Sequence, residues 1–559
     1  MAEYTILAWQ TLLRPPLPTE APNVVADVVN APLKALTCRN QVTSAVAVIT
    51  SDAPVKSARL VVSDLAFCEF RIPARAVRAR LVGVVPTPEA GPVCDPLYDV
   101  DEFAIDKSAA FHISIQVPED IPAGVYQGTV ALLVDGDDVA QNRIEVEVAE
   151  IDLPDVQAWD FFLNVWMNPA AIARRHSAEL WSKEHFDALL PYVRDLAEHG
   201  QKTVVAPICY QPWATQTRDP YPSLITWIKR GDSFEFDFSV FDRYVKLHGY
   251  CGIDRAIHCY SVAGWAGGEG ENTIEYVDAD TGEKSLLVTK LGDEQYTAVW
   301  AAFLAAFTEH LEDRGWLAKT YIAFDERPDD TMRMMIEFLD KHAPDLKISL
   351  AGNTKEEFYS AIDDLSLQIQ FSERGVADMS PAERASMGVA QLLAPEDACA
   401  ITGECPDKNI TTYYVCCGPA FPNTFIHSPL VESRMLGLLA SQGGFDGFLR
   451  WSYNDWPDDP YQHPEWGNWP TGDVMFVYPG ENGPVSSLRW EQLREGIQDY
   501  ELALIASANI RTPEEMVDYE QAITLACRNV DGRTKSIGDI EIARRLLIPI
   551  AEHQSEAVN

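Results

Sequence analysis

The chain has 559 residues and a formal net charge of -40, from 84 acidic and 44 basic side chains. An acidic chain of this kind lacks the basic face that nucleic acids and anionic membrane surfaces require, so we expect neither as a partner. Hydrophobic residues make up 47% of the sequence, which at this length is typical of a folded protein with two or three domains.

Signals for export or membrane insertion are not visible in the sequence. The start, Met1-Ala2-Glu3-Tyr4, has no basic stretch before a long apolar run, and no later segment reaches about 18 uninterrupted apolar residues. The 11 cysteines are odd in number and scattered, which favours reduced thiols over a disulfide framework. Cys399, Cys405 and His427 lack the paired short spacings of a zinc site, so no metal and no other cofactor is predicted. We therefore expect a cytoplasmic protein.

The N-terminal region shows the two-residue period of β-strands. Apolar residues alternate with polar ones in Ile113–Val117, Val130–Val134 and Ile144–Val148. A single polar face on each strand is typical of an antiparallel sheet packed on one side, and Pro122-Ala123-Gly124 supplies a turn between strands. We therefore predict an N-terminal β-sandwich over residues 1–155, with structural support as its simplest role.

After Leu153-Pro154-Asp155 the pattern changes, and strand-like runs alternate with amphipathic helical segments. One predicted helix, Ser182–His199, has a serine at its N-cap and Gly200 after its end. Eight alternations over roughly 300 residues predict a (β/α)8 TIM-like barrel over residues 156–485. The eight predicted strands are Asp160–Trp166, Lys202–Ile208, Arg255–Ser261, Lys319–Phe324, Leu346–Leu350, Leu367–Phe371, Thr411–Cys417 and Phe445–Trp451.

Three more amphipathic segments follow the barrel, over Leu488–Ser507, Thr512–Arg528 and Ile537–Glu552. They predict a C-terminal helical region, residues 486–559, that packs on the barrel. The connections after the second and third strands, Tyr210–Phe238 and Ala263–Asp293, are long, and loops of that length in a compact domain are usually functional. The predicted fold class is therefore multidomain, β followed by α/β.

The predicted fourth strand ends in two adjacent acids, Asp325 and Glu326. Barrel enzymes place their active sites at the carboxyl ends of the strands, so the two acids are a candidate catalytic pair. An isolated Asp-Glu dipeptide more often caps a helix or pairs with a neighbour, here Arg327. The cap of the next helix is expected at Asp330-Thr331.

Aromatic and amide side chains follow several other predicted strands. A sugar ring stacks its apolar face on Trp or Tyr, and its hydroxyl groups bind amides and carboxylates. Any single tryptophan is more often a core residue, but several beside paired acids on one barrel face favour a site for a neutral glycan. The candidate substrate-binding residues are Trp213, Trp265, Tyr413, Tyr414, Trp451, Tyr453 and Asn454.

The adjacency of the two acids also limits the mechanism. Retaining glycosidases usually take nucleophile and acid from different strands, with the carboxyl groups about 5 Å apart. Neighbouring residues of an extended chain point in different directions, so Asp325 and Glu326 are poorly placed to flank one bond. They can divide the work if one protonates the glycosidic oxygen while the other orients a 2-acetamido group that attacks in place of an enzyme nucleophile. This points to a glycan with a terminal amino sugar.

Several segments together resemble glycoside hydrolase family 123. They are Phe324–Pro328, Tyr413–Pro419, Gly447–Asn454, Gly472–Tyr500 and, in the β region, Val117–Gly124. The resemblance implies a β-sandwich before a barrel, and an exo-acting β-N-acetylgalactosaminidase with a retaining, substrate-assisted mechanism and an oxazolinium intermediate.

The resemblance also implies roles for single residues. Glu326 corresponds to the general acid/base, and Asp325 to the residue that orients the acetamido group. Tyr414 or Tyr413 is then expected to hydrogen-bond the acetamido oxygen, and Trp451 to stack on the sugar.

Two other interpretations of the sequence stay open. The first keeps both acids but changes the sugar, to β-GlcNAc or to a hexose without an acetamido group. In the second, the protein is a non-catalytic carbohydrate-binding protein whose acids only bind hydroxyl groups. The sequence specifies neither the linkage nor the oligomeric state.

Overall fold

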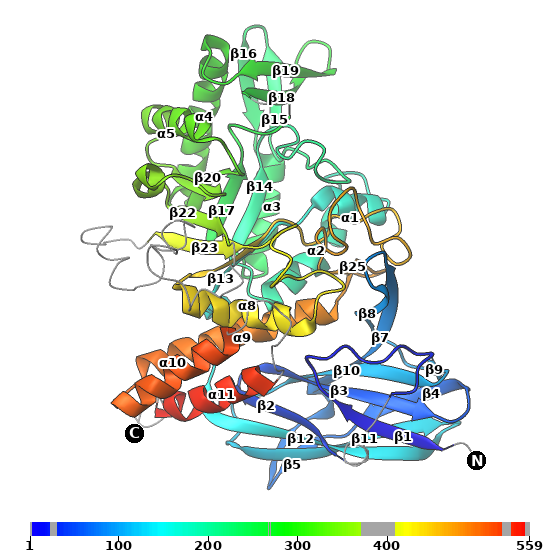
Figure 1. Ribbon diagram of the computed structural model, residues 1–559. Coiled ribbons are helices and arrows are strands. Elements are labelled where there is room, and N and C mark those ends of the chain that lie inside the picture. The colour runs from blue at the N-terminus through cyan, green and yellow to red at the C-terminus, as the bar shows by residue number, and fades with distance from the viewer. Residues whose placement is uncertain are drawn as a thin grey trace.

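The computed structural model describes residues 3–22, 31–266, 268, 270–369, 409–527 and 538–553. Its described part consists of an N-terminal β-sandwich, a parallel barrel and helices that pack where the two meet (Figure 1). This is the predicted fold class.

The β-sandwich is built from two sheets of mainly antiparallel strands. The alternating residues Val130, Leu132 and Ile144 are fully buried between them, as their period predicts. One sheet has the order β1 (Tyr4–Trp9), β3 (Val42–Ser51), β10 (Ser108–Gln116), β7 (Val77–Thr87), β8 (Gly91–Tyr98). The other has the order β2 (Leu33–Arg39), β12 (Asp137–Asp152), β11 (Gly124–Val134), β4 (Val55–Val62), β9 (Phe103–Ile105), with β5 (Leu65–Phe67) beside β11 and β6 (Phe70–Ile72) beside β5.

Eight parallel strands form the barrel, and each pairs with the next one in the chain except the first two. Between these, the backbone N–H of Lys202 donates to the carbonyl of Leu163 at 2.9 Å, so the barrel is nearly closed. The strands are β13 (Phe162–Val165), β14 (Thr203–Pro207), β17 (Ala256–Tyr260), β20 (Thr320–Phe324), β21 (Lys347–Ala351), β22 (Asp364–Gln368), β23 (Ile410–Tyr414) and β24 (Gly447–Arg450). The prediction of an eight-stranded barrel is confirmed.

The sixth strand begins three residues before its predicted start. Asp364 opens β22 and lies inside the barrel, with a carboxylate oxygen 3.1 Å from Nε2 of His258. Ser349 donates to the same carboxylate at 3.3 Å. Asp364 is a buried polar residue, so it did not belong to the apolar run on which the prediction of Leu367–Phe371 depended. Residues 370 and 371 lie outside the described part of the chain.

Helices cover the barrel strands on the outside (Figure 1). They are α1 (Pro169–Arg175), α2 (Lys183–Glu198), α3 (Ser239–Tyr250), α4 (Glu294–Arg314), α5 (Asp329–His342), a 3-10 helix (Glu356–Ala361), α8 (Leu430–Gly443) and α9 (Leu488–Ala508). Ser182 caps α2 as predicted, because its side chain accepts a hydrogen bond from the backbone N–H of His185. The predicted cap of α5 is wrong by two residues. Pro328 is at the N-cap, and Asp329 and Asp330 lie in the first turn, where the helix dipole favours acids.

The two long loops after β14 and β17 join into one four-stranded sheet. Its order is β16 (Ser233–Asp237), β15 (Thr226–Arg230), β18 (Glu271–Asp278), β19 (Lys284–Lys290), and the parallel pairing of β15 with β18 connects the two loops. Trp227 of β15 packs on Trp300 and Phe303 of α4, with ring centroids 5.2 and 4.8 Å apart. The sheet stands at the top of Figure 1, beyond the barrel strands.

Helices α8 and α9 cross with their backbones in contact. A Cβ built on Gly437 would lie 1.8 Å from the carbonyl oxygen of Gly496, so only glycine fits at this crossing. The last helices, α10 (Pro513–Cys527) and α11 (Gly538–Ala551), pack on α8 and α9 and agree with the predicted ranges, of which Arg528 and Ile537 lie outside the described residues.

Helix α9 also carries several of the contacts between barrel and sandwich. Arg80 of β7 forms a buried ion pair of 2.7 Å with Glu491. The side-chain amide of Gln498 accepts from the N–H of Val42 and donates to its carbonyl, both at 2.9 Å. The Gly472–Tyr500 segment that carried part of the family resemblance is therefore largely an interface with the N-terminal domain.

Candidate active site

The paired acids follow β20, a buried strand in the barrel wall. All five residues of β20 are buried between β17 and β21, which fixes the backbone up to Phe324. Asp325 is half-buried and Glu326 is exposed, so successive residues leave the strand end in different directions. Both acids lie at the carboxyl end of the fourth strand, as the sequence predicts.

Asp325 is held by a tryptophan from the loop after β17. The indole Nε1–H of Trp265 donates to Oδ2 of Asp325 at 2.9 Å. Burial, with the charge of Glu326, raises the pKa of Asp325, whereas hydrogen bonds from the backbone N–H of Glu326 and from Trp265 and the positive charge of Arg327 oppose the rise, which leaves the pKa at about 6. Asp325 therefore titrates near neutral pH.

Arg327 contacts the face of the same indole ring that donates to Asp325. Its guanidinium carbon lies 3.6 Å from the ring centroid of Trp265, in a cation–π contact. The side chain is 8% exposed, and its Nε and Nη2 atoms have no hydrogen-bond partner within the described residues. Burial lowers the pKa of Arg327 to about 10, and the negative charge of Asp325 counteracts this, so the guanidinium stays positive at neutral pH. Arg327 thus acts on Asp325 through charge and through the position of Trp265.

Glu326 has a different partner, on the seventh strand. The phenol of Tyr414 donates to Oε1 of Glu326 at 2.5 Å. Burial raises the pKa of Tyr414, and the charge of Glu326 raises it further, so the phenol keeps its proton and remains a donor.

Gly352, directly after β21, leaves the space that Glu326 occupies. A Cβ on Gly352 would lie 3.0 Å from Cα and 3.3 Å from Cγ of Glu326. The backbone of Gly352 also has a φ of 155°, a value that favours glycine. Glycine at this position therefore allows Glu326 to lie where it does.

A cluster of aromatic rings lines the barrel next to the acids. The rings of Trp166, Trp213 and Tyr260 lie with their centroids 4.8 Å from one another, and Tyr221 lies 4.5 Å from Trp213. Trp265, Tyr414 and Trp451 belong to the same cluster, together with Ala323, Ala351, Val205 and Leu449 of the strands. Four of the predicted substrate-binding residues, Trp213, Trp265, Tyr414 and Trp451, are therefore brought together at this end of the barrel. Trp213 is 3% exposed and forms part of the wall.

The loops after the last two strands are fixed by one buried arginine. Arg450, at the end of β24, donates to the carbonyl of Val415 at 2.6 Å, to Oδ1 of Asn423 at 3.0 Å and to Oδ1 of Asp473 at 2.6 Å. The next residue, Trp451, is half-buried and makes an edge contact with Trp469 at 5.3 Å between ring centroids. Arg450 thereby sets the position of this pair of tryptophans.

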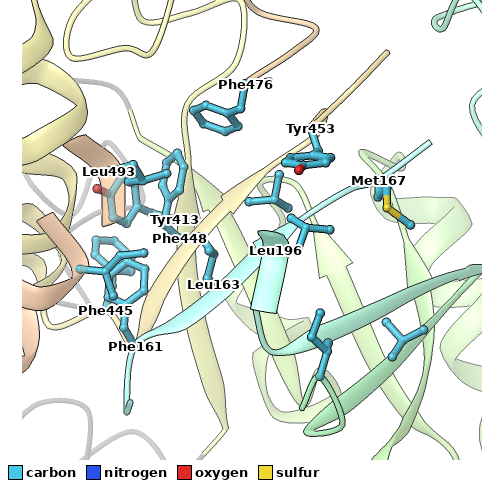
Figure 2. Close-up of a cluster of buried hydrophobic side chains, with 14 of the residues drawn as sticks. Phe161, Leu163, Met167, Leu196, Tyr413, Phe445, Phe448, Tyr453, Phe476 and Leu493 are labelled. Atoms are coloured by element: carbon cyan, nitrogen blue, oxygen red, sulfur yellow. The ribbon is translucent and has the colours of Figure 1, made fainter. Parts of the chain in front are cut away.

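Three predicted substrate-binding residues do not face the acids. The hydroxyl of Tyr413 donates to the carbonyl of Leu436 in α8 at 2.6 Å, and Figure 2 shows its ring in the core beside Phe445 and Phe448. Tyr413 points outward because neighbouring strand residues alternate, which leaves Tyr414 on the inner face.

Tyr453 and Asn454 have their polar groups occupied by other parts of the protein. The hydroxyl of Tyr453 donates to Oδ2 of Asp195 in α2 at 2.6 Å. The amide of Asn454 accepts from the N–H of Asn168 at 2.7 Å and donates to its carbonyl at 3.0 Å. Both residues are fully buried. Their hydrogen bonds therefore connect the segments that follow β13 and β24, and this position suits a structural role better than contact with a substrate.

Several residues of the site were missed by the sequence analysis. Tyr260 stands at the carboxyl end of the third strand, and that position was the signal that could have identified it. Trp166, at the end of the first predicted strand, is one of the tryptophans that the sequence places at this face, but it was not named as a substrate-binding candidate. Gly352 and Trp469 carried no comparable signal, since their roles depend on contacts between loops that lie far apart in the sequence.

Within the described ranges, no group of three or more His, Cys, Asp or Glu side chains is arranged to hold a metal ion. Cys399 and Cys405 lie outside these ranges. In the same part of the chain, the structure has no helix with the length and apolar character needed to cross a bilayer.

Comparison with known proteins gives a family. The family model described as glycoside hydrolase 123, catalytic domain, matches residues 166–506, which includes every barrel residue described above from Trp166 onward and most of α9. The search of curated proteins finds no match.

Among solved structures, a family 123 glycoside hydrolase from Clostridium perfringens, analysed for glycolipid glycan hydrolysis, aligns over 100% of both chains with a TM-score of 0.82 and 22% identity. A GH5 xyloglucanase from Bacteroides ovatus in complex with a XXXG heptasaccharide aligns over 83% of this chain and 98% of that chain, with a TM-score of 0.33 and 9% identity. The first likeness supports the same two-part fold, and the second is too distant to carry an argument. The family match spans more than half of the chain, which therefore belongs to glycoside hydrolase family 123 and is a glycoside hydrolase.

Proposed function

We propose that this glycoside hydrolase releases terminal β-linked N-acetylgalactosamine by a retaining mechanism in which the 2-acetamido group of the substrate is the nucleophile. The observation that carries the proposal is the separate support of two adjacent acids. Trp265 holds Asp325 and Tyr414 holds Glu326, so the two carboxyl groups are fixed for different tasks.

The position of the acids argues against a double displacement on an enzyme carboxylate. That mechanism needs two carboxyl groups about 5 Å apart on opposite sides of the anomeric carbon. Asp325 and Glu326 leave the end of a single strand next to each other. A nucleophile supplied by the substrate removes this requirement, because only one acid then has to reach the glycosidic oxygen.

In the proposed first step, the exposed Glu326 gives its proton to the glycosidic oxygen as the bond to the anomeric carbon breaks. The acetamido oxygen attacks the anomeric carbon from the other face and forms an oxazolinium ring. Asp325 accepts a hydrogen bond from the acetamido N–H, orients the group and stabilises the positive charge that develops on it.

In the second step, Glu326 takes a proton from water, which attacks the anomeric carbon and opens the oxazolinium ring. Two inversions at this carbon give net retention, and Glu326 returns to its protonated form. Trp451 and Trp265 supply half-buried aromatic surface beside the acids, which suits the apolar face of the sugar. The natural substrates we propose are oligosaccharides or glycolipid-derived glycans with a terminal amino sugar.

The first experiment tests the two acids with an aryl β-N-acetylgalactosaminide as substrate. Glu326→Gln and Asp325→Asn should each lower turnover on the order of 10²–10⁴-fold. Asp330→Asn is the matched control, since Asp330 is an exposed acid in the first turn of α5. Near wild-type turnover in both acid variants would overturn the assignment.

A second experiment separates the two roles. A substrate whose leaving group is a strongly acidic phenol needs little protonation, so it should restore much of the rate in Glu326→Gln and little in Asp325→Asn. Equal rescue of both variants would contradict the division of labour.

A third experiment tests the sugar. Aryl β-glycosides of GalNAc, GlcNAc and galactose are compared, together with a thiazoline inhibitor of GalNAc configuration. Substrate assistance predicts strong inhibition by the thiazoline and no turnover of the galactoside. Faster hydrolysis of the GlcNAc glycoside would change the proposed epimer, and hydrolysis of the galactoside would exclude the mechanism. The cytoplasmic location stays a prediction from the sequence, which fractionation of the source cells would check.

A further inference from the structure

Two adjacent cysteines, Cys416 and Cys417, follow β23 close to the catalytic acids. Their sulfur atoms are 3.8 Å apart, Cys417 is exposed, and Cys416 is half-buried. Tyr414, which donates to Glu326, comes only two residues before Cys416. The proposed catalytic steps use neither thiol, so the pair is available for other chemistry.

The backbone around the cysteine pair is fixed on both sides. The buried Arg450 donates to the carbonyl of Val415 at 2.6 Å. The buried amide of Asn423 donates to the carbonyls of Cys416 and Pro419, at 2.8 and 2.7 Å. The two thiols are therefore held near each other before any ligand arrives, which lowers the entropy cost of binding both of them to one atom.

The geometry favours an atom between the sulfurs over a direct disulfide. The Cα atoms of residues joined by a trans peptide are about 3.8 Å apart, whereas ordinary disulfides join Cα atoms separated by roughly 4.4–6.8 Å. A disulfide between Cys416 and Cys417 would therefore be strained. A soft atom that binds two sulfurs does not require them to approach to bonding distance, and sulfur ligands select soft atoms.

We propose that Cys416 and Cys417 form a dithiol site for trivalent arsenicals, and that its occupation lowers the hydrolase activity. With an arsine oxide, two S–H bonds and the arsenic–oxygen bond break, two arsenic–sulfur bonds form, and the oxygen leaves as water with the two thiol protons. Arsenic and sulfur keep their oxidation states, so no oxidant or reductant takes part. The exposed Cys417 reacts first, and the second bond then closes within the molecule.

The link to activity runs through Cys416. Its sulfur lies 3.8 Å from Nε2 of Gln368 at the end of β22, and its side chain packs against the aromatic cluster that contains Tyr414 and Trp451. An arsenic atom bound to this sulfur adds bulk at the edge of the cluster, two residues after Tyr414, while the backbone stays in place. The Tyr414–Glu326 hydrogen bond is then displaced.

Phenylarsine oxide tests the site on the full-length, reduced protein. Cys399→Ser and Cys405→Ser are introduced first, because these two cysteines lie outside the described residues and must not act as alternative partners. We expect one phenylarsenic group per chain by intact mass, stable to excess monothiol and removed by 2,3-dimercaptopropanol. Cys417→Ser should abolish this binding. Cys68→Ser is the matched control, since Cys68 is exposed on the sandwich, and should leave it unchanged.

Activity is measured on the same samples with the aryl glycoside that the enzyme turns over fastest. One equivalent of phenylarsine oxide should lower turnover at least tenfold in the parent, with recovery after the dithiol, and leave Cys417→Ser unaffected. Retention of the arsenical by Cys417→Ser, or full activity of the occupied parent, would overturn the proposal. The proposal would also be overturned if oxidised glutathione formed a disulfide between Cys416 and Cys417 while phenylarsine oxide did not bind. The mass measurement is independent of the preferred sugar, so it stands or falls separately from the proposed function.

Discussion

Trp265 donates its indole N–H to Asp325 at 2.9 Å, and the face of the same ring carries the guanidinium of Arg327. Burial alone would push the pKa of Asp325 upward, because it disfavours the charged carboxylate. The backbone N–H of Glu326, the indole hydrogen bond and the positive charge of Arg327 counteract burial and leave the pKa at about 6. One tryptophan therefore orients the acid and helps to keep it ionised near neutral pH.

Replacing Trp265 by Phe should move the acidic limb of the pH dependence of kcat/KM to higher pH. The hydrogen bond favours the carboxylate, so its loss raises the pKa of Asp325 above about 6, and more of the enzyme is then protonated at a given pH. The measurement is the pH profile of kcat/KM on both sides of pH 6. Trp227→Phe, in the core of the loop sheet, is the control and should leave the limb in place. An unshifted limb in Trp265→Phe would contradict the role of the indole.

Tyr414→Phe should lower kcat on the order of 10- to 100-fold, since hydrogen bonds to charged groups contribute about 1.5–3 kcal/mol. The variant lacks the hydroxyl that donates to Glu326, whereas its ring keeps its place in the cluster. Tyr413→Phe provides a matched control on the same strand. It removes a buried hydrogen bond to the carbonyl of Leu436, so it should lower the free energy of unfolding by about 0.5–1.5 kcal/mol and leave kcat unchanged. The reverse pattern would place the functional tyrosine on the other face of β23.

Gly352→Ala should impair catalysis through a steric contact with Glu326. The new Cβ would lie 3.0 Å from Cα of Glu326, so the glutamate backbone has to shift by a few tenths of an ångström. We expect kcat to fall on the order of tenfold, because catalysis depends steeply on the position of the acid. Gly136→Ala tests the backbone effect alone, since Gly136 has a φ of 86° and open space around it. Equal kcat values in the two variants would show that the contact does not matter.

Glu432 at the start of α8 should make the protein less stable as the pH rises. This glutamate is 3% exposed, its Oε2 accepts from the N–H of Asn423 at 2.7 Å, and burial raises its pKa to about 8. A raised pKa means that the stabilisation is complete below the unfolded value of 4.5 and is lost as the pH rises through about 8.

The stability test compares wild type with Glu432→Gln, which keeps the acceptor but cannot ionise. Between pH 5 and pH 8 the denaturation midpoint of the wild type should fall relative to that of the variant. Parallel midpoints across this range would mean that Glu432 is ionised in the folded protein. Asp330→Asn is the control: it removes an exposed acid and keeps Glu432, so its midpoint should fall between pH 5 and pH 8 as that of the wild type does.

The order of the barrel strands and the place of the paired acids were predictable, because both follow from local patterns. Each strand has its own apolar run, and a count of the runs puts Asp325 after the fourth. The sixth strand was misplaced because Asp364 faces the polar interior of the barrel, opposite His258, and no local pattern distinguishes this from a loop residue.

The details of the site were less predictable, since they depend on contacts between distant parts of the chain. The period of β23 shows that Tyr413 and Tyr414 face opposite ways, but only the closed barrel decides that Tyr414 is inside. Asn454 looked like a sugar ligand from its residue type. Its amide is instead hydrogen-bonded to the backbone of Asn168, 286 positions earlier in the sequence.

The parallel pairing of β15 with β18 has a consequence for the engineering and divergence of the barrel. The hairpins β15–β16 and β18–β19 come from different loops, yet each covers an edge of the other. Removing one hairpin would expose an unpaired strand that can recruit another chain. Trp227 of β15 would also leave, and with it the cover over Trp300 and Phe303 of α4. The two hairpins therefore form one structural unit. A shortened variant of the enzyme should lack both hairpins, and a homologue should have both or neither.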